Sequence, residues 1–151
     1  ATLPFASCYE NKQAVTALGD NAFALSNTDL LLHACIHRIA HGRNTERDRL
    51  LWLYDIHLLV EAMGDEELEG FSKKARERLV GVLCADAIEV AQELFGTELP
   101  EGFIQGLKAN RKNEPSAGLI HSSKLRWAWA DLRSLPGVSK KIAFARELLF
   151  G

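Results

Sequence analysis

Three histidines, His33, His37 and His41, recur at four-residue spacing in the stretch LLHACIHRIAHG (residues 31–42). Four residues are close to one turn of an α-helix, so a helix here would place the three imidazoles on one face. Imidazoles in such a row serve as metal ligands, as acid–base groups, or as structural residues that pair with an acid. The choice among these roles depends on the elements that position them.

Start and stop signals predict two successive helices around these histidines. Residues 26–29 (SNTD) fit a capping box before a helix that runs to about His41 and stops at Gly42. Residues 45–48 (TERD) repeat the signal before a second helix that stops at Gly64. Because few residues separate the two helices, we expect an antiparallel helical hairpin over about residues 27–62.

The hairpin predicts which residues lie opposite the histidines. With the turn centred near Asn44, His33 faces about Asp55, and His37 faces about Leu51 or Trp52. Asp55 stands among leucines, so we expect a buried carboxylate that needs a partner, since an unsatisfied buried charge costs several kcal/mol. A facing histidine is the natural partner, and the Trp52 ring brings one N–H donor to the same region.

Three interpretations of this cluster stay open. We favour a structural one, in which His33 or His37 pairs with Asp55, because buried polar residues are usually satisfied structural groups. In the second, His37, His41 and Asp55 bind zinc or another divalent ion, but HxxxH without HExxH is a weak metal signal. In the third, a His–Asp couple performs acid–base catalysis, although no nucleophile or oxyanion site accompanies it. We therefore name no catalytic residue and no metal ligand, and we describe a structural polar cluster of His33, His37, His41, Trp52 and Asp55.

Helical periodicity continues along most of the chain. We expect an all-α fold, a bundle of six to eight helices built around the hairpin, in a single domain over residues 1–151. Residues 110–118 (NRKNEPSAG) are the candidate for a loop or disorder. The only strand signal is LPFAS near the N-terminus. The further expected helices span about residues 10–18, 65–75, 79–95, 101–108, 122–135 and 139–150.

Composition and charge exclude several classes of function. The net charge is −2, and no apolar run is long enough to span a bilayer, so we expect a cytoplasmic protein without membrane contact. The three cysteines, Cys8, Cys35 and Cys84, show no CxxC spacing and fit a reducing compartment. Residues 108–151 are basic and residues 1–107 are acidic, but the basic residues do not interleave with aromatics, so we do not expect nucleic-acid binding.

Residues 30–59, which include His37, His41, Trp52 and Asp55, resemble a bacterial family of uncharacterised nucleotidyltransferases. Members of that family carry a catalytic half followed by a helical region with the pattern lLHlcxHxxxHxxxrLxWLxDixLL. The opening residues 3–31 and the closing RELLFG are also similar to this helical region. The resemblance implies that the chain is the C-terminal, helical part of a longer protein. It begins at Ala1 without methionine, as a piece or a processed product would.

The catalytic half of the family has a Gly-Ser pair and an Asp-x-Asp/Glu pair that holds magnesium against nucleotide phosphates. This sequence has no Gly-Ser pair, and its one such acidic pair, Asp65 and Glu67, is expected to open a helix. The resemblance thus implies a catalytically silent accessory or substrate-binding region without a cofactor of its own. Magnesium and a nucleoside triphosphate would belong to the N-terminal catalytic half, which would be its partner; the acceptor substrate is unknown. The alternatives are a small all-α metal-dependent hydrolase that uses His37, His41 and Asp55, and a protein-interaction module whose basic C-terminal third binds an acidic partner.

Overall fold

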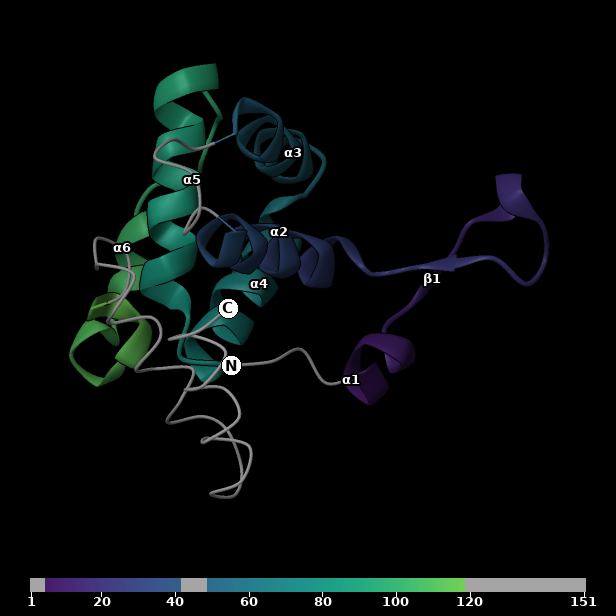
Figure 1. Cartoon of the computed structure of the whole chain (residues 1–151), viewed down its shortest axis with the longest axis horizontal. Coiled ribbons are helices and arrows are strands. Elements are labelled where there is room, and N and C mark those ends of the chain that lie inside the picture. The colour runs from purple at the N-terminus through teal and green to yellow at the C-terminus, as the bar shows by residue number, and fades with distance from the viewer. Residues whose placement is uncertain (1–4, 42–48, 119–151) are drawn as a thin grey trace, which may run out of the picture. The chain divides into compact units, whose positions relative to one another are not determined.

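A computed structural model of the chain describes residues 5–41 and 49–118 (Figure 1). In these ranges the fold is all-α, as predicted, with one small two-stranded sheet. The described residues up to Ala117 belong to one compact unit of the chain. In chain order its elements are α1 (Phe5–Glu10), β1 (Gln13–Ala14), the 3₁₀ helix η1 (Thr16–Leu18), β2 (Phe23–Ala24), α2 (Asn27–His41), α3 (Leu50–Glu61), α4 (Asp65–Glu77), α5 (Gly81–Phe95), α6 (Phe103–Lys108), η3 (Arg111–Asn113) and η4 (Pro115–Gly118).

Helices α2 to α6 share one hydrophobic core. Helix α5 contacts α2, α3, α4 and α6, and α2 also contacts α3 and α4 (Figure 1). Small residues let the other helices approach α5 closely, because alanine and cysteine side chains occupy much of its buried face. The largest side chains that are fully buried in this core are Phe71, Leu31, Leu32, Ile56, Ile88, Leu107 and Val60.

The helices begin and end where local signals in the sequence place them. At the start of α2, the Asp29 N–H donates to Ser26 Oγ at 3.2 Å, which is the first of the two bonds of the predicted capping box. The Asp29 carboxylate accepts the Ser26 hydroxyl at 3.0 Å through Oδ2, in place of the Ser26 backbone N–H that a full capping box would use. Gly96 ends α5 with a left-handed φ of 71°, a conformation that glycine adopts without strain. The predicted break near residues 76–78 lies at the junction of α4 and α5, where Leu79 takes a φ of 56°.

The N-terminal segment differs from the prediction. Residues 10–18 do not form a helix: β1 and η1 occupy most of this range, and β1 pairs antiparallel with β2 in the register Gln13–Ala24. The LPFAS stretch, which carried the only expected strand signal, instead enters helix α1 at Phe5. Both errors have the same cause, since two-residue strands and one-turn helices are too short to show hydrophobic periodicity.

Residues 110–118, the candidate for a loop or disorder, contain the two short 3₁₀ helices η3 and η4. Between them the buried Glu114 accepts the backbone N–H of Val82 through Oε2 at 2.8 Å, which attaches this segment to the start of α5. The helices expected at residues 122–135 and 139–150, and the hairpin turn at residues 42–48, lie outside the described residues.

Candidate functional site

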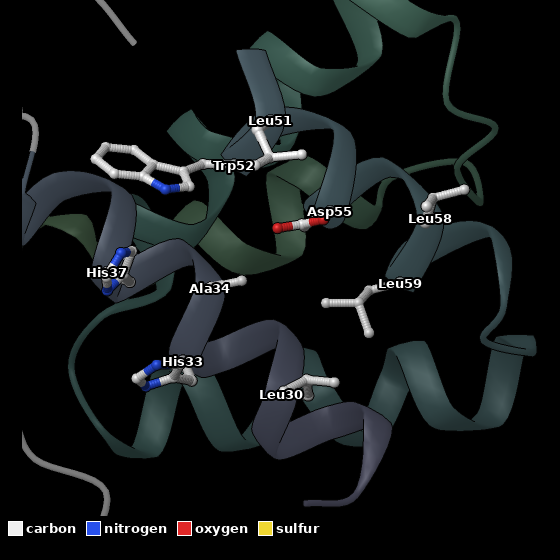
Figure 2. A pocket seen from close by; sticks show the side chains of 9 residues that line it. All are labelled: Leu30, His33, Ala34, His37, Leu51, Trp52, Asp55, Leu58 and Leu59. Atoms are coloured by element: carbon white, nitrogen blue, oxygen red, sulfur yellow. The ribbon is translucent and has the colours of Figure 1, made fainter. Parts of the chain in front are cut away.

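A pocket of about 550 Å³ lies between α2 and α3. Its lining residues recur at intervals of three and four along both helices, so it is formed by one face of each helix. Figure 2 shows that side chains from both helices project toward the space between them. The lining residues are Leu30, His33, Ala34, His37, Leu51, Trp52, Asp55, Leu58 and Leu59.

The aromatic end of the pocket is formed by His37 and Trp52. Their rings meet edge to face, with centroids 5.1 Å apart and an interplanar angle of 85°, and His33 lies one turn along α2 with its ring centroid 5.8 Å from that of His37 (Figure 2). The guanidinium of Arg49 lies over the Trp52 ring, 5.2 Å from its centroid. The contact between the His37 and Trp52 rings agrees with the predicted register, in which His37 lies opposite Leu51 or Trp52.

Asp55 is exposed, so the prediction of a buried carboxylate at this position is wrong. Its side chain points from α3 toward the side of the pocket where Ala34 and His37 lie (Figure 2). Within residues 5–41 and 49–118, no hydrogen bond or ion pair joins the Asp55 carboxylate to His33 or His37. The reason is that α3 is apolar on nearly every side, so leucine neighbours in the sequence do not show which face of the helix is covered.

The metal-binding alternative stays a prediction. Among the described side chains there is no group of three or more His, Cys, Asp or Glu residues arranged to hold a metal ion. The backbone of His41 completes α2, but its side chain lies outside the described part of the chain. Of the three predicted ligands His37, His41 and Asp55, the structure describes the side chains of His37 and Asp55, and both line the pocket.

Apolar residues dominate the pocket, and sequence reasoning assigned no binding role to them. Leu30, Ala34, Leu51, Leu58 and Leu59 line it, and Leu51 is 67% exposed. The signal that points to such a site is the composition of α3, in which leucines occupy positions on opposite faces. A helix that is apolar all round either lies fully inside a core or presents an apolar face to a ligand or a partner.

The acidic pair Asp65 and Glu67 lies where the sequence predicts, in the first turn of α4. Glu67 Oε2 accepts the backbone N–H of Gly64 at 3.4 Å, and Glu67 Oε1 accepts a hydrogen bond from Asn27 Nδ2 at 3.4 Å. Acids in this position are stabilised by the helix dipole. The pair therefore serves the start of a helix.

The family model of uncharacterised nucleotidyltransferases matches residues 2–96. This match covers more than half of the chain and includes α1 to α5 and every residue of the pocket. The chain belongs to this family. Comparison with curated proteins found no match, and comparison with solved structures found none either. Among the described residues, no helix has the length and hydrophobicity needed to cross a membrane.

Proposed function

We propose that this chain is the helical substrate-binding region of a nucleotidyltransferase-like protein, and that the pocket between α2 and α3 binds the acceptor substrate. The observation that carries the proposal is the pocket itself, which lies within the residues that the family model matches. Its volume of about 550 Å³ falls in the range of small-molecule sites. Apolar walls with a few convergent polar groups are the usual composition of such sites.

The nucleotide chemistry belongs, in this proposal, to a catalytic half that the chain does not contain. The sequence has no Gly-Ser pair, and Glu67 of its one acidic pair is engaged at the start of α4. Magnesium and the nucleoside triphosphate would therefore bind to that half, where paired carboxylates offset the charge of the phosphates. The role left to this chain is to hold the acceptor and complete the cleft.

An apolar surface on α3 supports the expected contact with a catalytic half. Leu50, Leu51, Tyr54 and Leu58 are all exposed on this one helix. They recur at intervals of three and four, so they form a stripe on one side of α3, and Leu51 and Leu58 also line the pocket. A contiguous apolar surface of this kind marks an interaction site, and here it borders the proposed acceptor site.

Three buried cysteines without a disulfide support a reducing location. Cys8, Cys35 and Cys84 are free in the described structure, and free buried cysteines are typical of proteins in the cytoplasm. We therefore include a cytoplasmic location in the proposal.

A nucleotidyl-transfer assay of the chain together with its catalytic half tests the proposal. Leu51→Ser should raise the KM for the acceptor about fivefold through lost apolar contact, and should leave the KM for the nucleotide unchanged. Leu50→Ser is the matched control, because Leu50 belongs to the same exposed apolar stripe as Leu51 but does not line the pocket. The chain alone should neither bind nor hydrolyse a nucleoside triphosphate with magnesium. Turnover by the chain alone, or equal acceptor KM values for the two variants, would contradict the proposal.

A further inference from the structure

We infer that the acceptor taken by the α2–α3 pocket is an amine: a molecule with an apolar body and one cationic ammonium group, which Asp55 binds. This inference rests on the proposed function of the pocket and adds the chemical class of its ligand. It follows from the charge, the position and the surroundings of Asp55.

Asp55 is the one carboxylate in the lining of the pocket, which also contains the imidazoles of His33 and His37. None of the nine lining residues is Lys or Arg. At the aromatic end the guanidinium of Arg49 faces the ring of Trp52, but Arg49 does not line the pocket. A ligand that fills the pocket therefore meets a carboxylate, and a positive group on the ligand is attracted where a negative one is repelled.

The Asp55 carboxylate is available to a ligand. Within the described part of the chain it makes no hydrogen bond and no ion pair, and it points toward the pocket (Figure 2). By contrast, the acids that hold the fold together are engaged: Asp29 binds Lys74, and Asp86 binds Arg38. An ammonium donating to Asp55 would form a charge-assisted hydrogen bond, which is about twice as strong as a neutral one.

The side chains around Asp55 determine which kind of molecular body the ligand can have. Ala34 and Leu59 lie on the two helices close to the carboxylate, and His37 and Trp52 close the same end with their edge-to-face rings (Figure 2). These side chains can cover the hydrocarbon or aromatic part of a ligand, and they offer few hydrogen-bond partners to hydroxyl groups on it. The favoured acceptor thus has an alkyl or aromatic body with an amine at one end, and a polyhydroxylated molecule fits this surface poorly.

Three probes with the same body and different head groups test the inference on the full chain. Phenylbutylamine, phenylbutanol and phenylbutyrate present an ammonium, a hydroxyl and a carboxylate. Their dissociation constants are measured by calorimetry at neutral pH, and binding is located by chemical-shift changes at Ala34 and Leu59. We expect the amine to bind about tenfold more tightly than the alcohol, and the carboxylate to bind most weakly.

Two pairs of variants test which residues cause the preference for the amine and which contribute to binding of all three probes. Asp55→Asn should abolish the preference for the amine and leave binding of the alcohol unchanged, while Glu69→Gln, which removes an exposed charge on α4 outside the pocket, should leave both unchanged. Leu51→Ser should weaken all three probes, and Leu50→Ser none. Asp55 and Glu69 are both exposed, so neither substitution should impair folding, which circular dichroism checks.

The outcomes separate this inference from the proposed function. If amine and alcohol bind equally and Leu51→Ser weakens both, the pocket binds ligands but the amine class is wrong. If phenylbutyrate binds best, the electrostatic argument is overturned in favour of Arg49. If phenylbutylamine does not bind at millimolar concentration, the amine inference is also overturned, and the acceptor KM of the transfer assay then decides separately whether the pocket is the acceptor site.

Discussion

Lys74 Nζ donates a hydrogen bond of 2.6 Å to Asp29 Oδ1, and this contact joins α4 to the start of α2. The Asp29 side chain is fully buried, whereas that of Lys74 is 19% exposed. The second carboxylate oxygen of Asp29 accepts a hydrogen bond from the Ser26 hydroxyl at 3.0 Å. A buried charge therefore obtains one partner from its own helix cap and one from another helix. Because α2 forms one wall of the pocket, this pair also positions the site.

Removal of Lys74 should destabilise the protein strongly. Lys74→Ala leaves the Asp29 carboxylate buried without its counter-ion, and the loss of one partner of a buried pair costs about 3 kcal/mol in the free energy of unfolding. Urea denaturation measures the difference. Lys73→Ala is the matched control, because the neighbouring Lys73 is exposed and should change stability by less than about 0.5 kcal/mol. Equal effects of the two substitutions would show that the pair does not hold α4 to α2.

Two glycine substitutions should have effects of opposite sign. A Cβ atom at Gly81 would lie 2.3 Å from the carbonyl oxygen of Leu107 and 3.0 Å from Glu114 Oε1, so α6 and the segment after it approach α5 too closely for any side chain. We expect Gly81→Ala to destabilise by about 2 kcal/mol. Gly70 lies within α4 with open space around it, so Gly70→Ala should stabilise by about 0.5–1 kcal/mol through helix propensity. The comparison of midpoints in thermal unfolding tests both, and a stabilising Gly81→Ala would refute the close approach.

Cys84 should make stability depend on pH in the alkaline range. Burial, followed by a hydrogen bond with Cys35, raises the pKa of the Cys84 thiol well above its ordinary value of 9.0. The unfolded chain therefore ionises this thiol at a pH where the folded chain keeps it protonated, so its contribution to stability is complete below pH 9.0 and is lost as the pH rises further.

The loss approaches about 1.4 kcal/mol for each pH unit, as expected for one group. It is measured as the difference in the pH dependence of unfolding between the native protein and Cys84→Ala. Cys84 should also resist alkylation until the protein is unfolded, since the thiolate is the reactive form. Parallel pH profiles for the two proteins would show that Cys84 ionises equally in both states.

Local signals predicted most of the helical fold. The capping box at Ser26 and Asp29, the glycine stop at Gly96 and the break before Leu79 each act within a few residues, so they can be recognised without knowledge of the packing. The contact between His37 and Trp52 could also be predicted, because a short connection limits the register of two neighbouring helices.

Features that depend on long-range packing could not be predicted. The partner of Asp29 lies 45 residues further along the chain, and Glu114 reaches the start of α5 from 32 residues away. No local pattern encodes either contact. The exposure of Asp55 was mispredicted for a related reason: the leucines around it in the sequence occupy all sides of α3, and only the packing of the other helices decides which side is open.

Two aspartates with opposite surroundings provide the last prediction. Asp55→Ala should change the free energy of unfolding by less than about 0.5 kcal/mol, because the carboxylate is exposed and makes no hydrogen bond or ion pair among the described residues. Asp29→Ala should cost about 3 kcal/mol, because it removes the acceptor of Lys74 and of the Ser26 hydroxyl from a buried site. Urea denaturation of both variants under the same conditions compares them directly. A loss of several kcal/mol in Asp55→Ala would mean that the carboxylate is buried against the histidines of α2, and that it is therefore a structural group unavailable to an acceptor in the pocket.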